Sequence, residues 1–97
     1  MREKVNVTFN EQVIEFVFYN RRPYVEVTVP HISSAGERYY VGINIHIESV
    51  LGTEKEYSKA VWTITDPNLK EFVRWYILQN LYRYKPYFKS RRKKMGL

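Results

Sequence analysis

The sequence predicts an α+β protein, in which an antiparallel β-meander of four or five strands is followed by one C-terminal α-helix packed on a face of the sheet. Three observations predict this fold class. Apolar and polar residues alternate in successive short runs, which is the period of a half-buried strand. The connections between these runs are short, as is usual for neighbouring antiparallel strands. An Asp-Pro pair then opens a long stretch with helical periodicity.

Three strands are predicted in the first third of the chain. They are expected at residues 5–9, 13–19 and 24–29. In each run apolar side chains recur at every second residue, so one face of each strand is apolar. Asn10-Glu11 and residues 20–23 are the expected turns, and Pro30 is expected to end the third strand.

The middle of the chain predicts a fourth strand and a candidate fifth. Residues 39–50 alternate over the longest stretch, and residues 31–38 before them form a loop. Residues 57–65 alternate less clearly, so a strand there and a short helix at 54–60 both remain open.

The C-terminal helix is predicted over residues 67–84. Asp66 can cap the free N–H groups of the first turn, and Pro67 suits the first helical position. Pro86 disfavours helix at the residue before it. The apolar residues expected to face the sheet are Leu69, Phe72, Val73, Tyr76, Ile77 and Tyr84. Residues 1–86 are therefore expected to form one domain, followed by a basic tail at 87–97.

A second apolar stripe runs along the other side of this helix. Trp75, Leu78 and Tyr82 recur at helical spacing where charged residues would be usual. Three partners could cover this stripe: a loop or the N-terminal strand, a second copy of the chain, or a different protein. We expect a homodimer as a secondary hypothesis.

Charge is divided unevenly along the chain. Residues 1–71 hold 8 basic and 10 acidic residues, a balance of −2, whereas residues 72–97 hold 8 basic and no acidic residues. An asymmetry of this kind indicates a polyanionic partner, either nucleic acid or an anionic membrane surface. A solvated, merely solubilising tail is the structural alternative. We rank the membrane lower because the helix should bury its most apolar face on the sheet.

The main functional hypothesis is non-enzymatic binding of nucleic acid, DNA or RNA, with low sequence specificity. Cations would contact phosphates, and the aromatic residues between them would stack on bases of a flexible strand. The residues expected to do so are Arg74, Arg83, Tyr84, Lys85, Tyr87, Phe88, Lys89, Arg91, Arg92, Lys93 and Lys94. The alternative is a protein–protein interaction module or a homodimeric accessory protein that acts on a host factor.

The predicted outer face of the sheet is a poor platform for phosphates. It would carry Glu15, Glu26 and Glu48, and these carboxylates would repel a polyanion. Three arginines at strand ends could add a second basic patch, although solvated turn charges are the simpler interpretation. They are Arg21, Arg22 and Arg38.

The sequence offers little for catalysis. The chain has no cysteine, which excludes disulfides, zinc knuckles and thiol chemistry. His46 and Glu48 would share a strand face, and His31 lies near two serines, but two histidines make a weak site. We therefore expect no enzyme activity, no metal and no cofactor. No apolar run reaches the length of a membrane-spanning helix, so we expect a soluble, cytoplasmic protein.

The composition of the chain resembles that of small orphan proteins from crenarchaeal viruses and plasmids. It is rich in tyrosine, valine and isoleucine, lacks cysteine, and has two glutamines, Gln12 and Gln79. Few thermolabile residues and many Lys and Glu residues fit a hot environment. The resemblance implies a place in the host cytoplasm and a role such as genome binding, transcription control or interference with a host factor. It assigns no site residue.

Overall fold

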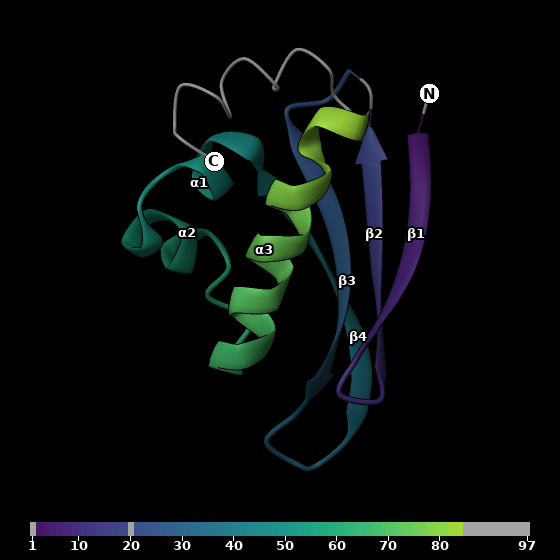
Figure 1. Cartoon of the computed structure of the whole chain (residues 1–97). Coiled ribbons are helices and arrows are strands. Elements are labelled where there is room, and N and C mark those ends of the chain that lie inside the picture. Colours follow the sequence, from purple (N-terminus) through teal and green to yellow (C-terminus); the bar gives the residue numbers. More distant parts are fainter. Residues whose placement is uncertain (1, 20, 85–97) are drawn as a thin grey trace.

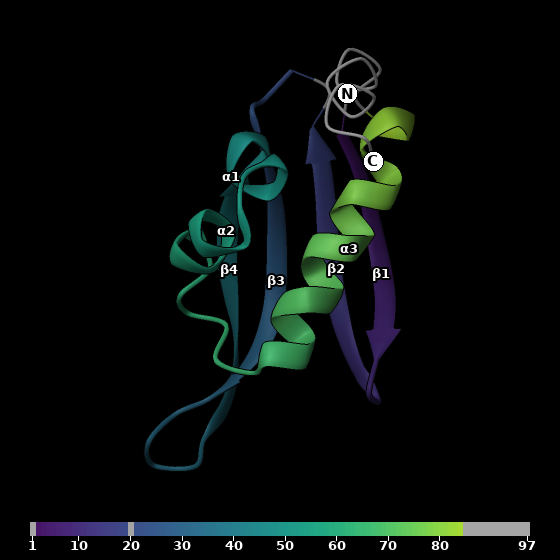
Figure 2. The ribbon, with the colours of Figure 1, turned by 60° about the vertical axis from the view of Figure 1, so that its left-hand side comes forward.

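A computed structural model describes residues 2–19 and 21–84, which fold as an antiparallel sheet covered by helices on one face (Figures 1 and 2). The elements in chain order are β1 (Arg2–Phe9), β2 (Gln12–Tyr19), β3 (Tyr24–Ile32), β4 (Arg38–His46), α1 (Ile47–Leu51), α2 (Glu54–Ala60) and α3 (Pro67–Tyr84). The strand order is β1-β2-β3-β4, and each strand pairs antiparallel with the next. The predicted meander and its C-terminal helix are confirmed, with four strands among the described residues.

The turn between β1 and β2 is the two-residue hairpin that the sequence predicts. Phe9 pairs with Gln12, and Asn10 and Glu11 both have positive φ, at 47° and 65°. Positive φ at both central residues suits the right-handed twist of the flanking strands. Asparagine tolerates this backbone region well, whereas glutamate is less usual there.

The alternation of the strands places one apolar face against the helices. Phe16 pairs with Val5 on β1 and with Val27 on β3, and Val27 pairs with Ile43 on β4. The inward residues of β2 and β3 are fully buried: Ile14, Phe16, Phe18, Val25, Val27 and Val29. They form a single cluster with residues of all three helices, so the core lies between the sheet and the helical layer.

The third strand is longer than predicted. Pro30 does not end it, because β3 continues to Ile32 and Pro30 pairs with Tyr40 of β4. Pairing with β2 reaches only Thr28. Beyond that point β3 has a strand on one side only, where the missing N–H of a proline is tolerated.

The predicted strand at 39–50 is wrong at its C-terminal end. β4 stops at His46, which pairs with the first residue of β3, Tyr24, so no partner strand remains beyond it. The N–H of Ile47 instead donates to the Pro23 carbonyl at 2.9 Å and the chain turns into α1. The buried residues Ile47, Val50 and Leu51 follow helical spacing, which places all three in the core.

The predicted fifth strand at 57–65 is also wrong, and the helix at 54–60 is the outcome. The Thr53 side chain accepts a hydrogen bond from the Glu56 N–H at 3.1 Å, and the Glu56 carboxylate accepts from the Thr53 N–H at 3.4 Å. This capping box satisfies the free N–H groups at the start of α2. Tyr57 and Val61 are then buried at i and i+4, whereas Trp62 is 75% exposed.

Helix α3 begins where the sequence predicts and continues to Tyr84, the last residue that the structure describes. The Asp66 side chain accepts from the Asn68 N–H at 2.9 Å, which caps the first turn. The fully buried positions are Leu69, Val73, Ile77 and Leu81. Phe72 and Tyr76 flank this row and are half-buried against the core. Phe72 stacks on Phe9, with ring centroids 4.6 Å apart, and Tyr76 lies 4.5 Å from Phe16.

Candidate nucleic-acid interface

Most of the predicted phosphate-binding residues lie outside the described part of the chain. They are Lys85, Tyr87, Phe88, Lys89, Arg91, Arg92, Lys93 and Lys94. Arg83 and Tyr84 belong to the last turn of α3, and their side chains also lie outside the described part. What the structure does show is where α3 ends, at the end of the sheet where β1 begins and β2 finishes (Figures 1 and 2).

Arg74 is the one predicted phosphate contact whose side chain is described, and this side chain contacts other parts of the fold. Its Nε donates to the Val50 carbonyl at 3.1 Å, and its Nη2 donates to the Gly52 carbonyl at 2.6 Å. The guanidinium also lies over the Tyr57 ring, 5.4 Å from the centroid. These contacts tie α3 to the end of α1 and to α2.

The predicted outer stripe of α3 is only partly exposed. Trp75 is 54% exposed, whereas Leu78 is half-buried and packs against the core. The Tyr82 side chain lies outside the described part. Trp75 lies 6.1 Å from Phe72, which stacks on Phe9 of β1, so the exposed indole borders an aromatic cluster at the edge of the sheet.

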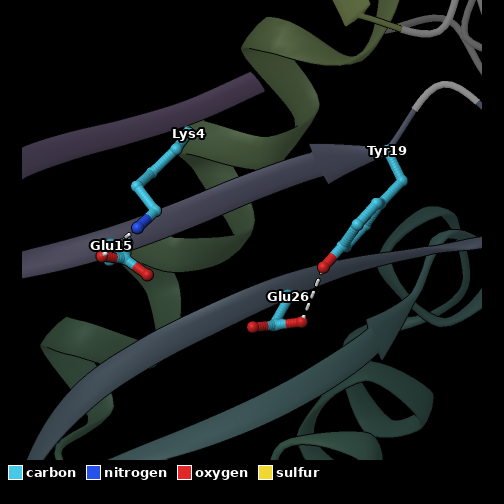
Figure 3. Close-up of polar contacts among 4 residues, drawn as sticks. All are labelled: Lys4, Glu15, Tyr19 and Glu26. Carbon is cyan, nitrogen blue, oxygen red and sulfur yellow. Dashed lines mark hydrogen bonds and ion pairs between the residues drawn. The ribbon is translucent and has the colours of Figure 1, made fainter. Parts of the chain in front are cut away.

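The open face of the sheet carries fewer carboxylates than the sequence predicts. The prediction that Glu48 lies on this face is wrong, because Glu48 belongs to the first turn of α1. Glu15 is paired with Lys4, with 3.7 Å between the Oε2 and Nζ atoms. The Tyr19 hydroxyl donates to the Glu26 carboxylate at 2.9 Å. Figure 3 shows both pairs on the side of the sheet that faces away from the helices.

Glu15 and Glu26 therefore each have a polar partner on a neighbouring strand. The hydrogen bond to Glu26 raises the pKa of Tyr19 above its ordinary value, because loss of the hydroxyl proton would place an anion against a carboxylate. Val17 lies between these polar residues on the same face and is 3% exposed. It pairs with Lys4 and Glu26, whose long side chains cover it.

Three arginines gather at the end of the sheet where α3 also ends. Arg2 begins β1 and pairs with Tyr19 at the end of β2, and Arg21 and Arg22 follow in the turn to β3. Arg22 Nη1 donates to the Tyr24 hydroxyl at 2.9 Å. Its guanidinium lies 5.3 Å from the Tyr19 ring centroid and 5.9 Å from that of Tyr24. The ring faces hold this cation in one place.

Of the three arginines suggested as a second patch, the structure brings two together. Arg38 lies at the start of β4, opposite Ile32 at the other end of the sheet. Arg2 takes its place, and this residue was missed. The available signal was topological, because in a β-hairpin the first residue of one strand lies beside the last residue of the next.

The described residues offer no arrangement suited to metal binding, since no group of three or more His, Asp or Glu residues lies close enough to hold an ion. His31 and His46 lie near opposite ends of β3 and β4, where each has an aromatic neighbour, Tyr39 at 5.2 Å and Tyr24 at 6.0 Å. None of the helices described here is long and apolar enough to cross a membrane.

Comparisons of the chain with protein-family models, with curated proteins and with solved structures gave no match.

Proposed function

We propose that this protein is a non-enzymatic nucleic-acid-binding protein of low sequence specificity, which contacts phosphates with the C-terminal end of α3 and the basic residues that follow it. The observation that carries the proposal is the segregation of charge. Residues 72–97 hold 8 basic and no acidic residues, although the chain as a whole has 10 acidic residues. Cations concentrated in this way attract a polyanion, and counterion release drives its binding.

The position of α3 supports the proposal. The basic segment follows α3 in the sequence, and α3 reaches Tyr84 at the end of the sheet that carries Arg2, Arg21 and Arg22. A polyanion drawn to one group of cations would therefore meet the other. Arg74 is not part of this surface, because its guanidinium is engaged with the backbone of residues 50 and 52.

The proposal implies charge-driven affinity with a preference for flexible strands. Aromatic residues alternate with cations where the helix ends, at Tyr82, Tyr84, Tyr87 and Phe88. Aromatic rings between cations suit single strands, whose bases can leave their neighbours and stack. A rigid duplex would use the cations alone.

The test is fluorescence anisotropy with labelled single-stranded DNA, duplex DNA and RNA at 50 and 200 mM salt. The full chain is compared with residues 1–86 and with a full-length variant in which Lys89, Arg91, Arg92, Lys93 and Lys94 are glutamine. If the segment contacts about five phosphates, affinity of the full chain falls roughly 10²–10³-fold over this salt range. Both altered proteins should bind weakly and with a flatter salt dependence.

A full-length variant with Lys55 and Lys59 changed to glutamine is the matched control. Both residues are exposed on α2. This control should bind almost as the unaltered chain does. Absence of binding by the full chain at micromolar concentration would refute the proposal.

A homodimer through the outer side of α3 is the second candidate, and the exposure of Trp75 favours it. Tryptophan is enriched at protein interfaces, and here it borders the ring of Phe72. A dimer would also double the basic segments, and effective concentration would then strengthen binding to a polyanion. The same surface would equally serve an interaction module that acts on another protein.

A further inference from the structure

The end of the open sheet face contains a small hollow lined by cations. Its volume is about 380 Å³, and its lining residues are Arg2, Tyr19, Arg21 and Arg22. Of the described residues, none that lines it is acidic. Arg2 reaches it from β1 and the other two arginines from the turn after β2, so antiparallel pairing of the two strands creates the cluster.

The aromatic residues beside the hollow hold one of its cations, Arg22, in place. The Arg22 guanidinium lies over the rings of Tyr19 and Tyr24 and donates to the Tyr24 hydroxyl. Tyr19 is fixed in turn by its hydrogen bond to Glu26 (Figure 3). The rings of Tyr19 and Tyr24 meet edge to face, 5.7 Å apart. A cation that is already ordered, as Arg22 is, loses less conformational freedom when an anion binds.

The carboxylates nearest the hollow are not among its lining residues, and two of them have partners on the sheet face. Glu26 is turned toward the Tyr19 hydroxyl, and Glu15 is paired with Lys4. Glu3 pairs with Phe18, a buried inward residue, which places it on the other face of β1. The lining residues thus carry three guanidinium groups and no carboxylate, and guanidinium groups bind phosphate oxygens through paired N–H donors.

We propose that Arg2, Arg21 and Arg22 bind a backbone phosphate of the nucleic acid, as a second contact beyond the basic C-terminal segment. This inference rests on the proposed function, and it names Tyr19 and Glu26 as positioning residues for the site. A strand bound to the C-terminal segment would run from the end of α3 onto the open face of the sheet. The ligand at the hollow is the phosphodiester itself, so the contact is independent of base sequence.

The experiment compares two exposed arginines at opposite ends of the sheet. Arg21→Gln and Arg38→Gln each remove one positive charge from the full chain, and neither side chain is buried. Loss of one phosphate contact should lower the slope of log affinity against log salt by about 0.7 for a single strand and 0.9 for a duplex. At 0.1 M salt this is a loss of roughly 5–8-fold in affinity, because each contact scales as salt to that power. Arg38→Gln should leave the slope unchanged.

Tyr19→Phe tests the positioning role. The variant keeps the ring beneath Arg22 and removes the hydrogen bond to Glu26. Because the arginines remain, affinity should fall while the salt slope stays near that of the unaltered chain. Circular dichroism checks that each variant is folded. An equal slope for Arg21→Gln and Arg38→Gln, in a chain that binds nucleic acid, would overturn the inference and leave the proposed function standing.

A titration with inorganic phosphate tests the anion site independently of nucleic-acid binding. Side-chain N–H signals of the arginines are followed by NMR as phosphate is added to the full chain. We expect saturable shifts for Arg2, Arg21 or Arg22 and none for Arg38. If the chain binds no nucleic acid and these shifts still occur, the proposed function fails while the anion site survives. Equal shifts at both ends of the sheet would refute the site.

Discussion

Replacement of Arg74 by methionine should destabilise the fold, because this side chain joins three helices. In the structure its Nε and Nη2 donate to the carbonyls of Val50 and Gly52, and its guanidinium lies over Tyr57. Methionine keeps most of the apolar stem but loses both donors. The two carbonyls at the end of α1 would then need water as a partner.

The expected loss follows from the two hydrogen bonds. A bond from a charged donor contributes about 1.5–3 kcal/mol, and Arg74 is half-buried, so the lower value applies to each. We expect the free energy of unfolding to fall by about 3 kcal/mol. For a chain of this length the corresponding fall in Tm is roughly 12–24 °C.

Urea unfolding followed by circular dichroism measures this loss. Arg38→Met, which removes an exposed arginine at the far end of the sheet, is the control and should change stability by no more than about 0.5 kcal/mol. Arg74→Lys should lose stability because one ammonium cannot replace the fork geometry, yet retain nucleic-acid affinity when folded. A loss below about 0.5 kcal/mol for Arg74→Met would refute the structural role.

Two further predictions concern Tyr57 and Trp75. Burial raises the pKa of Tyr57, whose hydroxyl donates to the Lys70 carbonyl at 2.6 Å. The protonated hydroxyl therefore stabilises the fold fully below the ordinary tyrosine pKa of 10.0, and this contribution to the free energy of unfolding is lost as pH rises further. Tyr57→Phe should cost about 1 kcal/mol at pH 7 and flatten the alkaline decline of stability, whereas Tyr40→Phe, on an exposed ring, should do neither. Trp75→Ala with Tyr82→Ala should shift a dimer to monomer in sedimentation, and Trp62→Ala should not; an unchanged mass would contradict the dimer.

The strands and the final helix could be predicted because their signals are local. Alternation in β2 and β3 is a property of adjacent residues, and the cap at Asp66 with Pro67 lies within a single turn. The end of β4 could not be found in this way. Alternation continues through Ile47, but the strand stops because its partner begins only at Tyr24. Thr53 and Glu56 did carry a local capping signal, which the apparent alternation after residue 57 obscured.

The sequence by itself determined the fold class, the course of α3 and the segregation of positive charge into residues 72–97. Tertiary structure decided what individual cations do. It directs Arg74 to backbone carbonyls, separates Arg38 from Arg21 and Arg22, and brings Arg2 beside them. The physical reason is that charge balance is a sum over residues, whereas a site depends on which strand ends meet. Strand pairing determines which strand ends are neighbours, and it brings together residues that are far apart along the chain.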